Sequence, residues 1–355
     1  MEQNERIPHF KDWRLDHWQY AYGQPTATAI FKDVPEDFIV TEKLGYDLTG
    51  EGENLYLLIE KTSMNTQQVC MHLAKVLQRR LRDVGYAGLK DKHAITRQWF
   101  SIQMNVKQEP DLTGVETPNI KLLQTIRHNR KLKVGSLKSN QFDIQLKSVS
   151  DIADVQRRLT HIAEHGVPNY FGEQRFGFKG NNLNWANRMA DGEAIRDKKV
   201  KGFGLSGARS FLFNEVLSAR LAGNPEVTAI EGDVFELAGS NSYFQQPLAP
   251  EIHQRLAEKD IYLTGPMFGD GEMLSKGDVQ TLENDIATQH PKWVKLLVDN
   301  GLKQERRALW LYPQNVKHTQ SGDNISLSFE LPSGTFATSV IRECIRILER
   351  ENTSQ

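Results

Sequence analysis

The chain has 355 residues, of which 39% are hydrophobic and 25% are charged, and its formal net charge is −1. This composition is ordinary for a soluble globular protein with room for two domains, and it argues neither for nor against a polyanionic partner. We expect a cytoplasmic protein without a membrane partner or a disulfide, because no apolar run could span a bilayer, the first residues lack a signal peptide's apolar core, and Cys70 and Cys344, the only cysteines, lie in apolar helical patterns.

Regular structure is expected to begin after a polar extension of about twenty residues. Between residues 34 and 61, two stretches of alternating apolar residues are typical of strands, and Gly50 and Gly52 mark a loop between them. A helix is predicted from Asn65, because Asn65 and Gln68 form a capping-box pattern before an apolar stripe. The basic run at residues 79–82 ends this helix.

Residues 85–99, GYAGLKDKHAITRQW, place a dense group of charges on a glycine-containing turn. Asp91 lies between Lys90 and Lys92, and His93 follows. A carboxylate flanked by cations is expected to stay ionised and to be available as a nucleophile or a base. A solvated charged turn explains this stretch equally well when it is taken alone. His93 either orients Asp91 or has a structural role.

The next stretch, residues 121–138, contains six cations and no acid. Such a run is most often a solvated face, but together with the cations around Asp91 it would form a stripe that binds phosphates. The following residues alternate as in a strand, which places Asn140 and Phe142 on one face. An amide beside a ring could contact a nucleobase, whereas a turn asparagine and a core phenylalanine are the simpler interpretation.

Ser150 is predicted to cap an amphipathic helix that ends at Gly166 and Pro168. Residues 169–182, NYFGEQRFGFKGNN, then mix aromatic side chains, cations and glycines. This composition suits either single-stranded RNA, whose bases stack on rings while cations meet phosphates, or a tightly packed turn. The pattern changes beyond this segment, so we expect a domain boundary there.

The rest of the chain is predicted to be mixed and mostly helical up to residue 310. Helices are expected at 206–221, 251–259 and 278–287, and a short strand at 233–237. A last strand at 325–331 leads into a C-terminal helix that begins near Phe336. We find no internal repeat.

Six motifs in this order resemble the TruD family of tRNA pseudouridine synthases. They are PEDFIV (35–40), AGLKDKHA (87–94), RKLKVGSLKSNQF (130–142), VPNYFGEQRFG (167–177), LSGARS (205–210) and LPSGTFATSVIRE (331–343). The resemblance extends from residue 35 to the last helix, and residues 192–303 match only loosely.

The resemblance implies an α+β fold. A pseudouridine-synthase catalytic domain with a mixed, mainly antiparallel sheet would be formed by residues 1–165 and 312–355. The family's own α/β insertion, the TRUD domain, would occupy residues 166–311.

The resemblance also implies roles for individual residues. Asp91 would be the catalytic nucleophile, and Phe38, Asn140 and Phe336 would bind substrate. Phe142 would stack on the target base, where related synthases carry a tyrosine. From their charge rather than from the resemblance, candidates for contacts with the RNA backbone are Lys90, Lys92, His93, Arg130, Lys131, Lys133 and Arg175. Lys90 and Lys92 could instead hold Asp91 as its anion, and we favour a backbone contact for at least one of them.

The implied reaction breaks the N1–C1′ bond of uridine, turns the base and rejoins it through C5. No redox step is needed, and the sequence contains neither a nucleotide-binding glycine fingerprint nor a clustered ligand set, so we expect no cofactor and no metal. Asp91 could attack C1′, add to C6 or remove the C2′ proton, and the sequence does not choose. Stacking on the rings of Phe38, Phe142 and Phe336 would offset part of the cost of everting the base, by about 1–3 kcal/mol per base.

Two other functions fit parts of the sequence. An RNA-binding protein without catalysis would use the basic run and the aromatic turn, with Asp91 as a turn residue. A hydrolase could use Asp91 in a covalent intermediate, and a glycosidase would need a second carboxylate opposite it. No partner is evident nearby in sequence, although the region of Glu343 could supply one.

The partner implied by the resemblance is tRNA, and the implied target is the uridine at position thirteen of certain tRNAs, glutamate tRNA among them. No residue in the sequence indicates how this uridine or these tRNAs would be selected. Nothing suggests an obligate dimer or another obligate protein partner, so a monomer is expected.

Overall fold

The structure is a computed structural model that describes residues 13–107, 109–223, 227–240 and 242–348. The chain divides into two compact units, and each is described by itself. The sheet unit comprises Pro25–His165, Tyr312–Ala337 and Cys344–Gln355, and the helical unit comprises Met1–Gln24, Gly166–Leu311 and Thr338–Glu343. The described residues 13–24 and the segment Thr338–Glu343 therefore group with residues 166–311, whereas the domain boundaries expected from the sequence place them in the other part.

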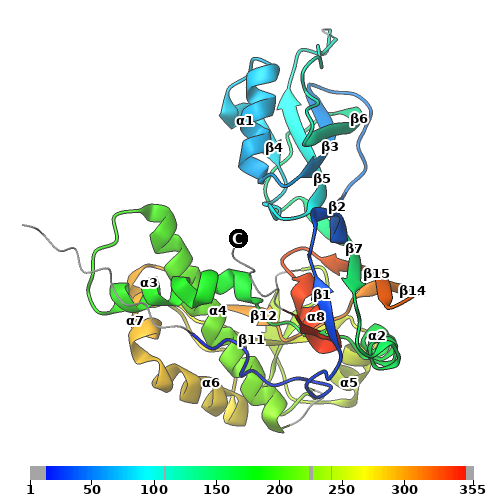
Figure 1. The fold of residues 1–355 in the computed structure, drawn as a ribbon. Helices are drawn as coiled ribbons and strands as arrows, with labels where there is room; N and C mark the ends of the chain where they lie inside the picture. Colours follow the sequence, from blue (N-terminus) through cyan, green and yellow to red (C-terminus); the bar gives the residue numbers. More distant parts are fainter. Residues whose placement is uncertain (1–12, 108, 224–226, 241, 349–355) are drawn as a thin grey trace, which may run out of the picture. The chain divides into compact units, whose positions relative to one another are not determined.

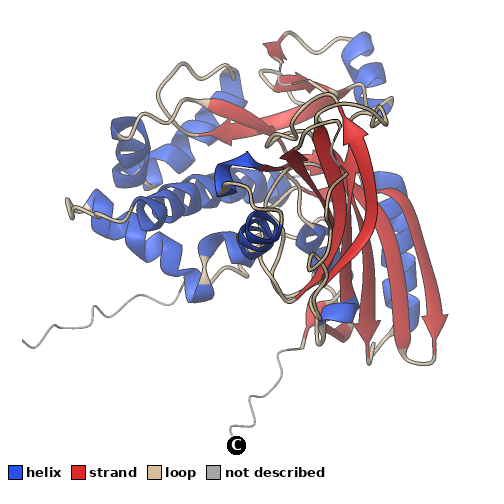
Figure 2. Ribbon diagram, turned by 90° about the horizontal axis from the view of Figure 1, so that it is seen from above, coloured by secondary structure: helices blue, strands red, loops and turns tan. Residues whose placement is uncertain are grey.

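The sheet unit is built around one large sheet, whose long strands lie side by side in Figure 2. Its strands are β1 (Thr28–Phe31), β2 (Phe38–Leu44), β3 (Asn54–Thr62), β4 (Val84–Tyr86), β5 (Ile95–Gln103), β6 (Ile120–His128), β7 (Leu137–Lys147), β14 (Gln314–Ser321), β15 (Asn324–Pro332) and β16 (Arg346–Ile347). The main path runs β14-β15-β7-β2-β5-β3-β6, with β1 beside β7 and β16, and β4 beside β5. Only the β2–β5 and β1–β16 pairs are parallel among the described pairings. These findings and the helices below confirm the α+β class and the mixed, mainly antiparallel sheet.

Two helices belong to the sheet unit, α1 (Thr66–Val76) and α2 (Ile152–His165). The apolar side of α1 packs on β3 and β5, where Leu57, Leu73 and Phe100 are fully buried in one core (Figure 1). The helix begins as predicted, because the side chain of Asn65 accepts from Gln68 N at 2.8 Å and the Gln68 side chain accepts from Asn65 N at 2.9 Å.

The predicted cap of α2 was wrong by one residue. Asp151 Oδ1 accepts from Asp154 N at 2.9 Å, so Asp151 caps the helix. Ser150 Oγ instead accepts from Thr28 N at 2.8 Å and joins the start of α2 to β1. Both residue types are good caps, and the sequence alone does not show that Ser150 is engaged by a strand from far along the chain.

The helical unit carries helices around a small antiparallel sheet (Figure 1). The sheet has the order β10-β9-β11-β12, and β8 pairs with β13. The elements are β8 (Val167–Pro168), α3 (Asn181–Ala190), α4 (Lys198–Gly223), β9 (Val234–Leu237), β10 (Tyr243–Gln245), α5 (Pro250–Ala257), β11 (Ile261–Met267), α6 (Gly277–Gln289), α7 (Pro291–Asp299), β12 (Glu305–Ala308) and β13 (Trp310–Leu311). Helix α8 (Ala337–Cys344) contributes Thr338–Glu343 to this unit. None of the described helices is long and apolar enough to cross a membrane.

Helix α4 begins at Lys198, eight residues before the predicted start at Ser206. Glycines in this first part made it resemble a loop in sequence. A Cβ on Gly204 would lie 2.6 Å from the Met189 methyl group and 3.1 Å from Ala186 N. Glycine therefore lets α3 approach α4 closely, and packing between the helices overrides the low helix propensity of glycine.

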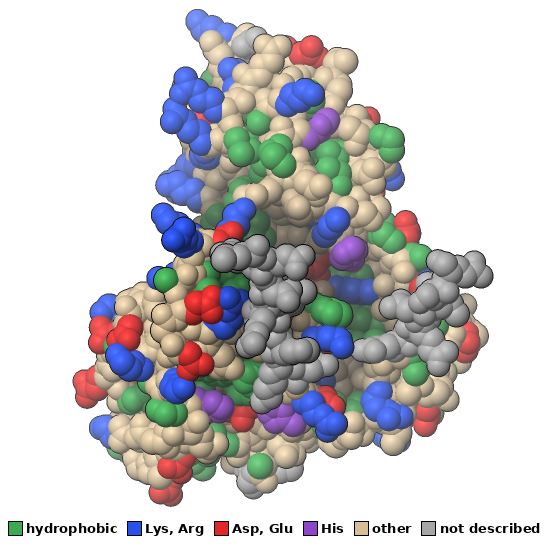
Figure 3. Space-filling model, turned by 60° about the vertical axis from the view of Figure 1, so that its left-hand side comes forward, with side chains coloured by type: hydrophobic (Ala, Val, Ile, Leu, Met, Phe, Trp, Pro, Cys, Tyr) green, Lys and Arg blue, Asp and Glu red, His purple; other side chains and the backbone are tan. Residues whose placement is uncertain are grey.

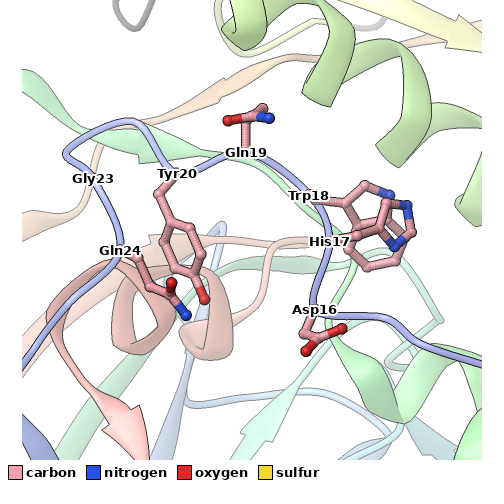
Figure 4. A pocket seen from close by; sticks show the side chains of 7 residues that line it. All are labelled: Asp16, His17, Trp18, Gln19, Tyr20, Gly23 and Gln24. Carbon is pink, nitrogen blue, oxygen red and sulfur yellow. The ribbon is translucent and has the colours of Figure 1, made fainter.

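Residues 13–24 are an integral part of the helical unit, which corrects the expectation of a polar extension for these residues. The rest of the expected extension, residues 1–12, lies outside the described residues. Trp18 is 3% exposed, and its Nε1 donates to Glu215 Oε1 of α4 at 2.7 Å. His17 Nε2 lies 2.7 Å from the same oxygen, and Gln19 N donates to Ser218 Oγ at 2.9 Å. Figure 4 shows His17 beside Trp18 at a cavity that this segment lines. Trp18 and Trp13, whose Nε1 donates to Asn184 Oδ1 at 3.0 Å, anchor the segment despite its polar composition.

Candidate active site

Asp91 lies in the turn between β4 and β5 of the sheet unit, and hydrogen bonds from α1 and β5 fix this turn. Lys90 N donates to Thr66 Oγ1 at 2.9 Å, and Gln98 Nε2 donates to Gly88 O at 2.6 Å. Thr66 and Gln98 are also bonded to each other at 3.1 Å. The turn is therefore held by buried polar groups, while the Asp91 side chain remains 41% exposed.

A buried lysine supports the turn from β3. Lys61 is fully buried, and its Nζ donates to the backbone oxygens of Asp91 at 2.9 Å and of Met64 at 2.5 Å. Desolvation lowers the pKa of Lys61 to about 8, although the nearby Asp91 charge opposes this shift. Lys61 thus ties the Asp91 backbone to the sheet.

The Asp91 carboxylate pairs with Lys32, which follows β1. Lys32 Nζ lies 3.0 Å from Asp91 Oδ2 and 3.5 Å from the centroid of the Phe38 ring. The Lys32 backbone has a φ of 57°, in the left-handed region that non-glycine residues seldom adopt. One ammonium group therefore connects the carboxylate to the aromatic part of the site.

The aromatic part of the site lies on one face of the sheet. Phe38 and Phe142 occupy neighbouring strands, with ring centroids 5.8 Å apart, and Phe142 stacks on Phe329 of β15 at 5.5 Å. In the register of β2 and β7, Val40 is opposite Phe142 and Glu42 is opposite Asn140. Asn140 and Phe142 therefore share the face predicted from their spacing. Phe38 and Phe142 are mostly buried, so a base would meet only part of each ring.

Asn140 is joined to the Asp91 turn through Lys90. Lys90 Nζ donates to Asn140 Oδ1 at 2.6 Å and lies 3.0 Å from Glu42 Oε1. The Lys90 side chain is 7% exposed and that of Glu42 is 0% exposed. Burial raises the pKa of Glu42, and the Lys90 charge opposes that shift. The Lys90 ammonium group lies inside the protein, between a carboxylate and an amide. Its predicted contact with the RNA backbone stays a prediction.

Phe336 lies in the turn between β15 and α8 and is half-buried. The end of β15 is close to the site, since Leu331 is opposite Asn140 in the sheet register. The role of Phe336 in substrate binding stays a prediction.

Cations gather on two adjoining loops of the sheet unit. The loop between β6 and β7 is anchored by Leu132, which is 1% exposed and whose N donates to Ser101 Oγ at 2.9 Å. Lys131 Nζ donates to Arg82 O at 2.7 Å, which joins this loop to the one that follows α1. We call the exposed cations of the two loops the basic surface: Arg79, Arg80, Arg82, Arg130, Lys131 and Lys133. On the face shown in Figure 3, Lys and Arg side chains gather along one edge of the part that carries α1 and β3–β6 in Figure 1.

The basic surface lies beside the strand that leads to Asp91. Gly135 N donates to Ala87 O at 3.0 Å, and a Cβ on Gly85 of β4 would collide with Leu132 O. Lys92 and His93 are exposed on the Asp91 turn itself. Contacts of these side chains with RNA stay a prediction, as does a role for His93 in orienting Asp91.

Residues 169–182 belong to the helical unit, and most of their aromatic rings are core. Tyr170, Phe171 and Phe176 are buried, whereas Phe178 is 84% exposed. Arg175 is half-buried, lies 5.0 Å from the Phe171 ring and donates to Ser206 Oγ at 3.0 Å. The composition of this segment thus reflects packing, and a backbone contact by Arg175 stays a prediction.

Three residues of the site were missed by the sequence analysis, namely Lys32, Glu42 and Lys61. Glu42 and Lys61 are charged residues at positions that the strand alternation assigns to a buried face, which was an available signal. Lys32 precedes the PEDF motif and carried no such signal. Its left-handed backbone is visible only in the structure.

A further cavity in the sheet unit, of about 190 Å³, lies on β2, β7, β14 and β15 and is lined by Glu36, Ile39, Asp143, Ile144, Gln145, Lys317, His318, Thr319, Ser326, Leu327 and Ser328. Asp143 pairs with Ile39 in the sheet and alternates with Phe142, so its side chain points away from the face that carries Asn140. This cavity is separate from the Asp91 site.

Comparisons with known proteins agree on one family. A sequence model of the family "tRNA pseudouridine synthase D (TruD)" matches residues 14–196 and 193–344. A tRNA pseudouridine synthase D from Pseudoalteromonas atlantica is 43% identical over 340 residues, which cover 94% of this chain and 97% of that protein. One from Aeromonas salmonicida is 42% identical over 339 residues, covering 95% and 96%.

A solved structure has the same fold. The crystal structure of a Methanosarcina mazei protein described as tRNA pseudouridine synthase D (TruD) superposes with a TM-score of 0.68 at 20% sequence identity. The match covers 92% of this chain and 95% of that one.

Proposed function

Because the chain belongs to the TruD family of tRNA pseudouridine synthases, we propose that it isomerises a uridine of tRNA to pseudouridine at the Asp91 site of the sheet unit. The target is the uridine at position thirteen. One observation carries this proposal: two ammonium groups link the Asp91 turn to the residues expected to bind the base. Lys32 contacts both Asp91 and Phe38, whose ring lies beside that of Phe142, and Lys90 donates to Asn140.

The site supplies what the isomerisation needs. The N1–C1′ bond of uridine breaks, a C5–C1′ bond forms, the C5 hydrogen leaves as a proton and N1 gains one, so the product has the same atoms as the substrate. A partly exposed carboxylate can act as a nucleophile toward the nucleoside or as a base toward its protons. Asp91 fills that role, and Lys32 is a positioning residue that holds Oδ2 at 3.0 Å.

The target base must leave the RNA stack to reach Asp91. The rings of Phe38 and Phe142 provide an apolar wall beside the carboxylate, and Asn140 provides a polar group on the same face. The basic surface, on the loop next to β4, supports binding of the tRNA backbone near the everted base. Together these groups would bind the RNA and present one nucleotide to Asp91.

The hydrolase alternative gains no support from the carboxylates around Asp91. Glu42 is the acid connected to the site through Lys90, and its side chain is fully enclosed and committed to that ion pair. Glu343 is fully buried within the helical unit, where it accepts from Tyr22 N at 3.4 Å. Neither is placed as the second solvent-accessible carboxylate that a glycosidase mechanism uses.

Asp91→Asn tests the proposal because it keeps the shape of the side chain and removes its charge. Nucleoside chromatography of tRNA incubated with the protein measures pseudouridine, and a filter or mobility assay measures tRNA affinity. We expect loss of pseudouridine with tRNA affinity within about threefold of wild type, since phosphate contacts dominate affinity. Asp111→Asn, at an exposed loop, is the matched control and should retain both properties. Unchanged product from Asp91→Asn would exclude Asp91 as the reacting group, and product absent from the wild-type protein as well would favour a protein that only binds RNA.

A further inference from the structure

We infer that Lys90, held by Glu42, is a positioning residue that fixes the amide of Asn140 with its Nδ2 donor toward the substrate, so that the site recognises a carbonyl oxygen of the uracil ring. This inference rests on the proposed function and deepens it, because it assigns a recognition chemistry to a position that was expected only to contact substrate. It is carried by the geometry of three side chains in the sheet unit.

The orientation of the Asn140 amide follows from the chemistry of its partner. The oxygen and nitrogen of an amide are interchangeable in shape, and the partner decides which way the group is turned. A lysine ammonium has only hydrogen-bond donors, so the amide atom 2.6 Å from Lys90 Nζ must be the oxygen. The nitrogen, on the other side of the planar group, is therefore turned away from Lys90.

The Nδ2 donor is left available by the protein. Within the described part of the chain, Asn140 Nδ2 has no hydrogen-bond partner. It is also not one of the atoms that are shielded from solvent and lack a partner. The atom therefore keeps access to solvent although the residue as a whole is buried. A buried amide with one satisfied end and one accessible donor is an arrangement that a ligand acceptor would complete.

Glu42 keeps Lys90 in place. Its carboxylate lies 3.0 Å from Lys90 Nζ and also accepts from Trp99 N at 3.0 Å. Glu42 is directly opposite Asn140 across the β2–β7 pair, so Lys90 reaches over the sheet face to form an ion pair with Glu42 and a hydrogen bond with Asn140. The hydrogen bond to Asn140 is charge-assisted, which makes it shorter and stronger than a neutral one and resists rotation of the amide.

A carbonyl oxygen is the ligand atom that this donor fits. Uracil carries O2 and O4, which are acceptors, and charge builds on both as the N1–C1′ bond breaks. Asn140 lies on the same face as Phe142, where the ring of an everted base would stack. An amide turned the other way would place an oxygen against the uracil carbonyl and repel it.

The test measures the cost of replacing each carbonyl oxygen by sulfur, which is a weaker acceptor. tRNA transcripts carrying uridine, 2-thiouridine or 4-thiouridine at the modified position are compared by kcat/KM, and the readout is the ratio of the oxygen to the sulfur substrate. Loss of one hydrogen bond is worth about fivefold. We expect this ratio to be about fivefold or more for wild type at one of the two positions, and to collapse toward unity in Asn140→Ala, which has no amide.

Lys90→Met should lower the ratio to the Asn140→Ala value. Because this variant leaves Glu42 buried without its cation, the double variant Glu42→Gln/Lys90→Met provides the same test without an unpaired charge. Glu42→Gln alone keeps the Lys90 donor and leaves a side-chain oxygen that can still accept from Lys90, so it should keep most of the wild-type ratio. Lys92→Met, at the neighbouring exposed lysine, should change both substrates equally and leave the ratio as it is.

Two results would overturn the inference. One is a wild-type ratio in Lys90→Met and in the double variant, which would show that Lys90 does not set the amide. The other is a wild-type ratio in Asn140→Ala at both sulfur positions, which would show that Asn140 does not donate to a ring carbonyl. Either can occur while the wild-type protein forms pseudouridine through Asp91, so failure of the inference is distinct from failure of the proposed function.

Discussion

Two stretches of this chain have similar composition but differ in the exposure and the contacts of their side chains. Residues 85–99 and residues 169–182 both mix glycines, cations and aromatic side chains, and both suggested contact with RNA. In the first, the Asp91 side chain remains 41% exposed beside Lys32. In the second, Phe176 is 0% exposed and Arg175 is turned toward Phe171 and Ser206.

The difference lies in what supports each stretch. The Asp91 turn rests on a buried polar frame from α1, β3 and β5, which leaves its carboxylate to face outward. In residues 169–182, most rings are buried in the core of the helical unit, where Phe171 and Phe176 contact phenylalanines of α4. Composition shows that a segment is unusual, and the partners of its side chains decide whether it is a site.

The largest expected effect is on stability, and it concerns residues 169–182, whose rings are mostly packed in a core. Phe176→Ala should lower the free energy of unfolding by about 3–5 kcal/mol, because it leaves a cavity in the core. Phe178→Ala, at a ring that is 84% exposed, should change it by less than about 0.5 kcal/mol. Urea denaturation measures both, and equal effects at the two positions would contradict the assignment of Phe176 to packing.

Lys32→Met should impair activity at residues 85–99, the stretch that we propose to be catalytic. The variant keeps an apolar stem over Phe38 and removes the cation 3.0 Å from Asp91 Oδ2. Loss of the group that positions a reacting carboxylate should lower kcat by about 100-fold with little change in KM. Steady-state kinetics on tRNA checks this expectation, and a change confined to KM would assign Lys32 to binding instead.

Lys61 should make stability depend on pH. Its pKa is lowered to about 8 in the folded protein, so between pH 8 and the ordinary lysine pKa the unfolded chain binds more protons. The free energy of unfolding therefore rises with pH through this window. Relative to Lys61→Met, wild type should gain about 2–3 kcal/mol between pH 7 and pH 10. Denaturation at several pH values measures the difference, and parallel curves for the two proteins would show that Lys61 is not titrating there.

The smallest expected effect concerns the basic surface. Arg82→Gln and Lys133→Gln should each weaken tRNA binding a few-fold and reduce the slope of log affinity against log salt by about 0.7–0.9 if each side chain meets one phosphate. Lys295→Gln, at an exposed lysine of α7, is a matched control that should leave the slope unchanged. Equal slopes for all three variants would show that tRNA does not bind at these loops.

Much of the site was predictable from local patterns and from the family resemblance. The spacing of Asn140 and Phe142 fixed their common face, and the charges around Asp91 marked its turn. The strands and the capping box at Asn65 follow from alternation and short-range chemistry. Each of these signals lies within a few residues.

The rest depends on contacts between residues that are distant in sequence. Lys90 is next to Asp91 in the chain, yet it is buried by Glu42 and Asn140 from other strands. Lys32 reaches Asp91 across fifty-nine positions. Gly204 and Gly207 of α4 are tolerated because α3 approaches them closely. Sequence patterns report on neighbours along the chain, whereas these features depend on the register and packing of separate elements.

The most direct measurement is the single-turnover release of tritium from tRNA labelled at uracil C5, with protein in saturating excess. Every uridine converted must lose its C5 hydrogen, and saturation removes differences in affinity. We predict that Asp91→Asn releases tritium more than about 1000-fold more slowly than wild type, and that Arg175→Gln remains within about tenfold. Release by Asp91→Asn at the wild-type rate would contradict the assignment of the chemistry to this carboxylate.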